Sequence, residues 1–89
     1  MKDNPMKIKE NHEKFRCPCC GYFTLPNTGA YDICPVCFWE DDVVQEDDPF
    51  FAGGANDLCL AECRRNYELY GACEERFKER VRKPLPEEM

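Results

Sequence analysis

Two closely spaced cysteine motifs constrain the fold of this chain more than any other feature. They are Cys17-Pro18-Cys19-Cys20 and Cys34-Pro35-Val36-Cys37, with 13 residues between them. Each C-x-x-C pair can place two thiolates on one face of a tight turn, about 3.5–4 Å apart, the edge of a tetrahedron with zinc–sulfur bonds of about 2.3 Å. Two such turns complete the tetrahedron and leave no open position. The spacing therefore predicts one structural zinc ion held by Cys17, Cys20, Cys34 and Cys37.

The small size of the chain means that its core needs additional stabilisation. A chain of 89 residues builds only a marginal core and needs a metal, disulfides or a partner, and eight cysteines offer either of the first two. The N-terminus is charged and has no apolar signal segment, and no run is long enough to cross a bilayer. We therefore expect a cytoplasmic protein without membrane association, whose paired cysteines remain reduced and bind metal.

The other cysteines leave alternatives open. Cys19 could replace Cys20 as a ligand, but the C-x-C bite differs and only Cys20 is followed by a glycine. Cys19 is therefore expected to be a spare or reactive thiol beside the site. Cys59 and Cys63 lie four residues apart and could share a second metal, although such residues more often pack as small apolar side chains. A thioredoxin-type dithiol is disfavoured because no βαβ pattern surrounds either motif.

The chain is expected to form one domain. Residues 1–13 are polar and predict an N-terminal tail, residues 14–84 a single cysteine-rich zinc-binding domain, and residues 85–89 a C-terminal tail.

Local patterns predict an α+β fold. Residues 22–25 and 31–33 are rich in aromatic or β-branched side chains and predict two short strands joined by a turn. A helix is expected to start near Asn56 or Asp57 and to end at Gly71. A second helix is expected over 74–82. The prediction is a zinc-ribbon-like β part followed by two C-terminal helices.

The charge pattern bears on partners. The formal net charge is -6, and a four-thiolate zinc site makes it about -8, so nucleic acid is an unfavourable partner. The segment after the second motif is strongly acidic and can be a solvated turn beside a core tryptophan, a surface for a basic protein, or a hard-cation site. The candidate partner-binding residues are Trp39, Glu40, Asp41, Asp42, Asp47 and Asp48.

The sequence has few residues arranged for catalysis. His12 is the single histidine and lies in the polar tail, and no nucleophile–base pair is evident. The sequence therefore favours a small cytosolic binding or regulatory module over an enzyme. Two alternatives stay open: a metal-dependent hydrolase with an open cation site among the carboxylates, and a redox or metal sensor that uses Cys19.

Several segments together resemble the bacterial cysteine-rich CPCC family. They are Cys17-Pro18-Cys19-Cys20-Gly21-Tyr22, residues 31–42, Gly53-Gly54-Ala55-Asn56 and Val81-Arg82-Lys83-Pro84. The resemblance implies a small single-domain bacterial protein and assigns no function. By analogy alone, an immunity or antitoxin-like inhibitor is a further possibility.

Overall fold

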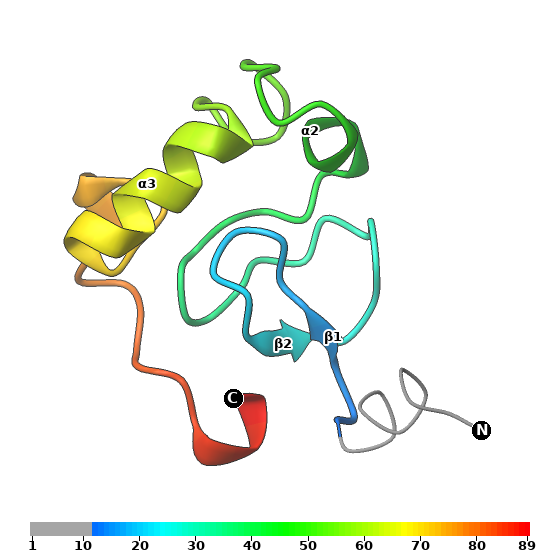
Figure 1. Ribbon diagram of the computed structural model, residues 1–89, viewed down its shortest axis with the longest axis vertical. Coiled ribbons are helices and arrows are strands. Elements are labelled where there is room, and N and C mark those ends of the chain that lie inside the picture. Colours follow the sequence, from blue (N-terminus) through cyan, green and yellow to red (C-terminus); the bar gives the residue numbers. More distant parts are fainter. Residues whose placement is uncertain (1–11) are drawn as a thin grey trace.

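The computed structural model describes residues 12–89, so most of the predicted N-terminal tail lies outside the described part. In Figure 1, strands β1 and β2 lie below helices α2 and α3, and the chain after α3 returns until its end lies near β2. In order, the elements are β1 (Phe15–Arg16), β2 (Phe23–Leu25), α2 (Val43–Asp47), α3 (Leu60–Tyr70) and two 3-10 turns, η1 (Glu75–Phe77) and η2 (Pro86–Glu88). The α+β class is confirmed. None of the helices in residues 12–89 is long and apolar enough to cross a membrane.

The strand pairing differs from the prediction. β2 pairs antiparallel with β1, with Phe15 opposite Leu25 and Arg16 opposite Phe23. The expected partner, residues 31–33, instead forms an isolated bridge between Ile33 and Glu40. The predicted hairpin was wrong because each cysteine motif closes its own turn, so the chain entering a motif pairs with the chain leaving it.

Helix α3 ends as predicted and begins later than predicted. Gly71 has a φ of 77° and its N–H donates to the carbonyl oxygen of Tyr67 at 2.8 Å, a left-handed glycine ending. Asn56 does not cap the helix. Its amide oxygen accepts from the backbone N–H of Glu40 at 2.9 Å, so it holds the acidic segment instead.

The second C-terminal helix is reduced to the single turn η1. Beyond that turn the chain docks on the second cysteine motif, and the N–H of Arg82 donates to the carbonyl oxygen of Pro35 at 3.2 Å. This contact draws residues 81–85 out of helical geometry. The residues predicted as a C-terminal tail contain η2, whose Glu88 side chain is buried.

Cysteines make up a large part of the core. The fully buried large apolar side chains are few, chiefly Trp39, Leu25, Leu60 and Val36. Cys17, Cys34 and Cys37 are buried among them, and Cys20 packs against this cluster. A core with so little aliphatic mass gives a small hydrophobic stabilisation. The cysteine cluster therefore occupies the position where a larger domain would place bulky apolar residues.

Candidate metal centre

The two cysteine motifs fold into turns with the same backbone hydrogen bonds; we call these turns the knuckles. In the first, Cys17 N–H donates to Tyr22 O and Gly21 N–H donates to Cys17 O, both at 2.8 Å. In the second, Cys34 N–H donates to Trp39 O at 3.0 Å and Phe38 N–H to Cys34 O at 2.8 Å. The donor and acceptor spacings along the chain are identical, so the two motifs are two copies of one local structure.

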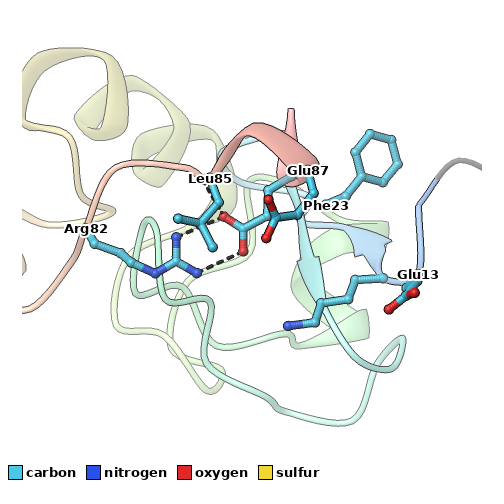
Figure 2. A pocket seen from close by; sticks show the side chains of 7 residues that line it. Glu13, Phe23, Arg82, Leu85 and Glu87 are labelled. Carbon is cyan, nitrogen blue, oxygen red and sulfur yellow. Dashed lines mark hydrogen bonds and ion pairs between the residues drawn. The ribbon is translucent and has the colours of Figure 1, made fainter.

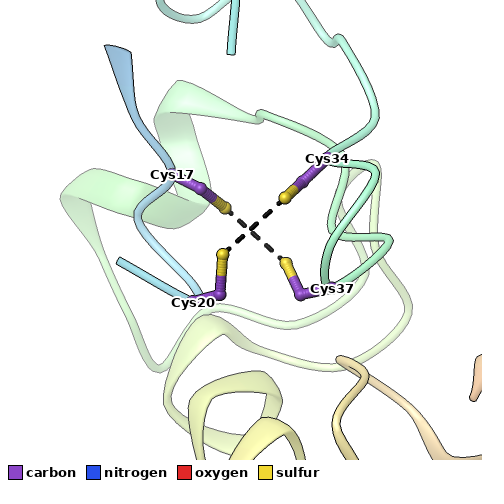
Figure 3. Close-up of side chains that lie close together, drawn as sticks. All are labelled: Cys17, Cys20, Cys34 and Cys37. Carbon is purple, nitrogen blue, oxygen red and sulfur yellow. Dashed lines mark hydrogen bonds between the residues drawn. The ribbon is translucent and has the colours of Figure 1, made fainter. Parts of the chain in front are cut away.

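The knuckles direct four sulfur atoms at one point. Figure 3 shows the side chains of Cys17, Cys20, Cys34 and Cys37 converging from opposite sides. The Sγ atoms of Cys17 and Cys37 are 3.6 Å apart, those of Cys20 and Cys34 are 3.7 Å apart, and all four lie within 4.8 Å of one another. These separations match the edge of a tetrahedron about a metal with metal–sulfur bonds of about 2.3 Å.

The surroundings of the sulfurs suit negative charge. The Thr24 hydroxyl lies 3.0 Å from Cys34 Sγ, and the backbone N–H of Val36 donates to the same sulfur at 3.4 Å. Hydrogen bonding with Cys17, together with that from Thr24, lowers the pKa of the Cys34 thiol. Hydrogen bonding with Cys17 raises the pKa of Cys37, because it favours the neutral thiol of Cys37. A divalent cation would replace these shared protons and accept all four sulfurs as thiolates.

The four cysteines therefore fit a metal ion with a closed sulfur shell. Cys17, Cys34 and Cys37 are fully buried, and Cys20 is half-buried. Cys19 is buried but does not belong to the converging group. Four protein donors fill a tetrahedral shell and leave no position for water or substrate, so the arrangement suits a metal held as a scaffold.

The remaining cysteines serve packing. Cys59 precedes α3, and its thiol lies 3.9 Å from a carboxylate oxygen of Glu62. Cys63 is fully buried on α3. Cys73 is buried as well, and its N–H donates to the carbonyl oxygen of Cys37 at 2.7 Å. Within residues 12–89, no group containing Cys59 or Cys63 has three donors close enough for a second metal.

The acidic segment is folded rather than wholly exposed. Trp39, Asp41 and Asp42 are buried, with relative exposures of 0%, 2% and 4%. Asp42 Oδ1 caps α2 by accepting from Val44 N–H at 2.8 Å, and its Oδ2 accepts from Ala55 N–H at 2.9 Å. Hydrogen bonding from Ala55 is the main reason that the pKa of Asp42 is lowered. Trp39, Asp41 and Asp42 are thus part of the framework and not of a free surface.

Two buried polar residues hold this segment: Asn56, predicted as a helix start, and Gln45, which sequence reasoning missed. The Gln45 side-chain amide donates to the carbonyl oxygens of Phe51, Asn56 and Leu58 at 3.1–3.2 Å. The Asn56 amide donates to Gln45 Oε1 at 2.9 Å and to Glu40 O at 2.8 Å. Asp42 followed by Gln45 three positions later is a helix-start pattern that could have indicated α2.

The remaining predicted residues lie on the outside. Asp47 and Asp48 are exposed and Glu40 is half-buried. His12, expected to be solvated, stacks on Phe23 with ring centroids 3.5 Å apart.

A pocket of about 530 Å³ lies near the C-terminal turn, away from the sulfurs. Figure 2 shows Arg82 in it with both guanidinium nitrogens bonded to a carboxylate, that of Glu88, at 2.9 and 2.8 Å. The pairing with Arg82 lowers the pKa of Glu88. Since these opposite charges satisfy each other, they fasten η2 to the body of the protein.

A comparison with protein families agrees with the geometry of the knuckles. Residues 15–88 match the family described as cysteine-rich CPCC. The chain belongs to the cysteine-rich CPCC family. The match covers both knuckles, the acidic segment, α3 and the C-terminal turns, so these parts together are the family's shared unit. No curated protein sequence matches the chain.

Proposed function

We propose that this member of the cysteine-rich CPCC family is a zinc-stabilised cytoplasmic binding module that docks a basic protein through an acidic face. The zinc ion is the scaffold. Four thiolates select zinc or iron over magnesium or calcium, and their closed shell suits a structural role. Metal analysis separates the two candidates, since a four-thiolate iron site is coloured and redox-active whereas a zinc site is neither.

The acidic face consists of exposed residues on and after α2. They are Val43, Val44, Glu46, Asp47, Asp48, Phe50 and Phe51. Phe50 carries the proposal, because its side chain is 80% exposed and lies two residues from Asp48, whose carboxylate accepts its N–H at 3.2 Å. An aromatic ring held in water beside carboxylates has the composition of a protein-docking surface.

The buried network beneath the face supports this reading. Asp42, Gln45 and Asn56 fix the backbone of α2 and of the loop after it through hydrogen bonds of 2.8–3.4 Å. A rigid backbone lowers the entropy lost when the exposed side chains bind. The acidic face is therefore a preformed surface that a partner can bind with little loss of entropy.

The test compares two triple variants of the metal-loaded protein. The first carries Asp47→Asn, Asp48→Asn and Phe50→Ala on the acidic face. The matched control carries Glu68→Gln, Glu79→Gln and Leu69→Ala, which remove the same charge and one exposed apolar side chain elsewhere. A partner captured from the source cells is purified, and its affinity for each protein is measured by calorimetry at two salt concentrations.

We expect the acidic-face variant to bind at least about tenfold more weakly, with a smaller salt dependence, and the control to bind like wild type. The proposal is overturned if both variants lose the same affinity for the partner, or if neither variant loses any.

A further inference from the structure

A second surface has the opposite charge to the acidic face. It is a groove of about 520 Å³ between the end of α3 and the chain after η1. Its main lining residues are Tyr67, Tyr70, Lys78, Val81, Lys83 and Pro84. No acidic side chain lines it, although the protein as a whole carries a charge of -6.

The walls of the groove are apolar. Tyr67 and Tyr70 lie three residues apart on α3 and form one wall, and Val81 and Pro84 form the other. Tyr67 is braced from behind by an edge contact with Tyr22, whose ring centroid is 6.4 Å away. Tyr70 is 40% exposed. Tyrosines placed in this way give a large rigid contact area with little loss of side-chain entropy.

The lysines that line the groove can bind an anionic ligand. Lys83 is exposed and forms no ion pair within residues 12–89. Lys78 has one exposed partner, Glu75, at 3.8 Å, which is a weak pairing. Arg82 also lines the groove, but its guanidinium is bound to Glu88 and holds the wall in place. One unpaired ammonium group, that of Lys83, and one weakly paired group, that of Lys78, therefore line a site with aromatic walls.

The backbone of the same wall presents an open edge. Arg82 N–H is bonded to Pro35, while in the described chain the N–H groups of its neighbours Val81 and Lys83 make no backbone hydrogen bond. Lys83 precedes Pro84, which biases its backbone to the extended region, and Leu85 two residues later is extended, with φ -81° and ψ 158°. Alternate backbone groups of an extended segment point to opposite sides, so the N–H groups of Val81 and Lys83 face away from Pro35. The carbonyl oxygen of Lys83 is already used, since it accepts from the Arg82 guanidinium at 3.0 Å.

We propose that this groove binds an extended acidic peptide segment of a partner protein. An apolar side chain of the peptide enters between Tyr67, Tyr70 and Val81, and carboxylates on either side of it meet Lys78 and Lys83. Carbonyl oxygens of the peptide accept from the N–H groups of Val81 and Lys83, and a peptide N–H donates to the carbonyl oxygen of Val81, in the manner of β-strand addition. The site is independent of the acidic face and of its partner.

A peptide fits these observations better than a nucleic acid does. A phosphodiester chain cannot accept and donate along the open backbone edge as a peptide does. Its charge is also continuous, so it meets repulsion from the acidic remainder of the protein beyond the groove. A peptide can place its carboxylates only where the two lysines lie.

The experiment measures fluorescence anisotropy of a labelled peptide with the full-length, metal-loaded protein. The probe is a short peptide of glutamates flanking two phenylalanines, and its companion has glutamine in place of glutamate. The variants are Lys83→Glu and Tyr70→Ala in the groove, and Arg65→Glu, an exposed cation on α3 that does not line it. Circular dichroism and metal content establish that each variant is folded.

We expect saturable binding of the acidic probe by wild type and by Arg65→Glu within twofold of each other. Lys83→Glu, Tyr70→Ala and the glutamine probe should each weaken binding about tenfold. Equal weakening by Arg65→Glu and Lys83→Glu, no saturation by the acidic probe, or tighter binding of a single-stranded oligonucleotide that displaces it overturns the proposal.

Discussion

Gly21 and Phe38 occupy the same position in the two knuckles. Each lies four residues after the first cysteine of its motif, donates its N–H to that cysteine's carbonyl oxygen at 2.8 Å, and has a positive φ, 85° for Gly21 and 73° for Phe38. Glycine adopts this backbone freely, whereas a phenylalanine there is strained by about 1–2 kcal/mol. The Phe38 ring packs on Phe77 with centroids 4.6 Å apart, and this contact offsets the strain.

This relationship predicts an unusual order of stability at position 38. Both Phe38→Ala and Phe38→Gly lose the ring contact, but only the alanine retains the strained backbone. We expect the glycine variant to be more stable than the alanine variant by about 1 kcal/mol, the reverse of the usual order in regular structure. Urea unfolding of the metal-loaded proteins measures this difference in the free energy of unfolding. Gly21→Ala is the control for strain alone, because an added Cβ there meets no atom within 4 Å.

The closed sulfur shell predicts one metal ion per chain and a fold that depends on it. Cys37→Ser removes a fully buried ligand and should abolish stoichiometric metal binding together with cooperative unfolding. Cys19→Ser, two residues from the ligand Cys17, should retain one ion. Elemental analysis and near-ultraviolet circular dichroism give both readouts. A Cys19 variant that loses its metal would show that the ligand set is wrong.

Asp42→Asn is expected to destabilise the protein by about 1–3 kcal/mol. Both carboxylate oxygens of Asp42 accept backbone N–H groups, so an amide nitrogen in place of either one faces a donor. Hydrogen bonding from Ala55 lowers the pKa of Asp42 in the folded state. Its contribution is therefore present above the ordinary carboxyl pKa and is lost as the pH falls through the lowered one.

Asp41→Asn is expected to stabilise the protein, in contrast to Asp42→Asn. Burial raises the pKa of Asp41, against a hydrogen bond from Gly29, and the charges of Asp32 and Asp42 raise it further. An asparagine can still accept the Gly29 N–H through its amide oxygen while removing the buried charge. We expect about 1 kcal/mol of added stability at neutral pH.

The advantage of Asp41→Asn over wild type should shrink as the pH falls through the raised pKa, because wild-type Asp41 then becomes neutral in the folded state. Chemical denaturation down to the lowest pH at which the metal stays bound measures this. A loss of stability at neutral pH would show that the Asp41 charge is needed.

The sequence predicts the sulfur centre better than the rest of the fold, for a physical reason. A C-x-x-C turn is a local structure, so its spacing alone places Cys17 and Cys20 on one face. The C-terminus of α3 is equally local, since Gly71 supplies the left-handed residue that ends it. Both features follow from a few adjacent residues.

The structural predictions fail where contacts between distant parts of the chain determine the local structure. Residues 22–25 have the composition of a strand, but their partner was set by the closure of the first knuckle and not by the next apolar run. Residues 78–82 have helix-forming composition, but Arg82 bonds to Pro35 instead. A run of acids suggests exposure, yet Asp42 is buried because backbone N–H groups from position 55 reach it.

All four sulfur ligands lie between residues 17 and 37, before α3 and everything after it. During synthesis, all four cysteines are in place before more than half of the chain, residues 38–89, has been added. The later segments, including Cys73 and Arg82, then dock on a finished template through the carbonyl oxygens of Cys37 and Pro35. We therefore expect the supply of metal during translation to set how much of this protein matures.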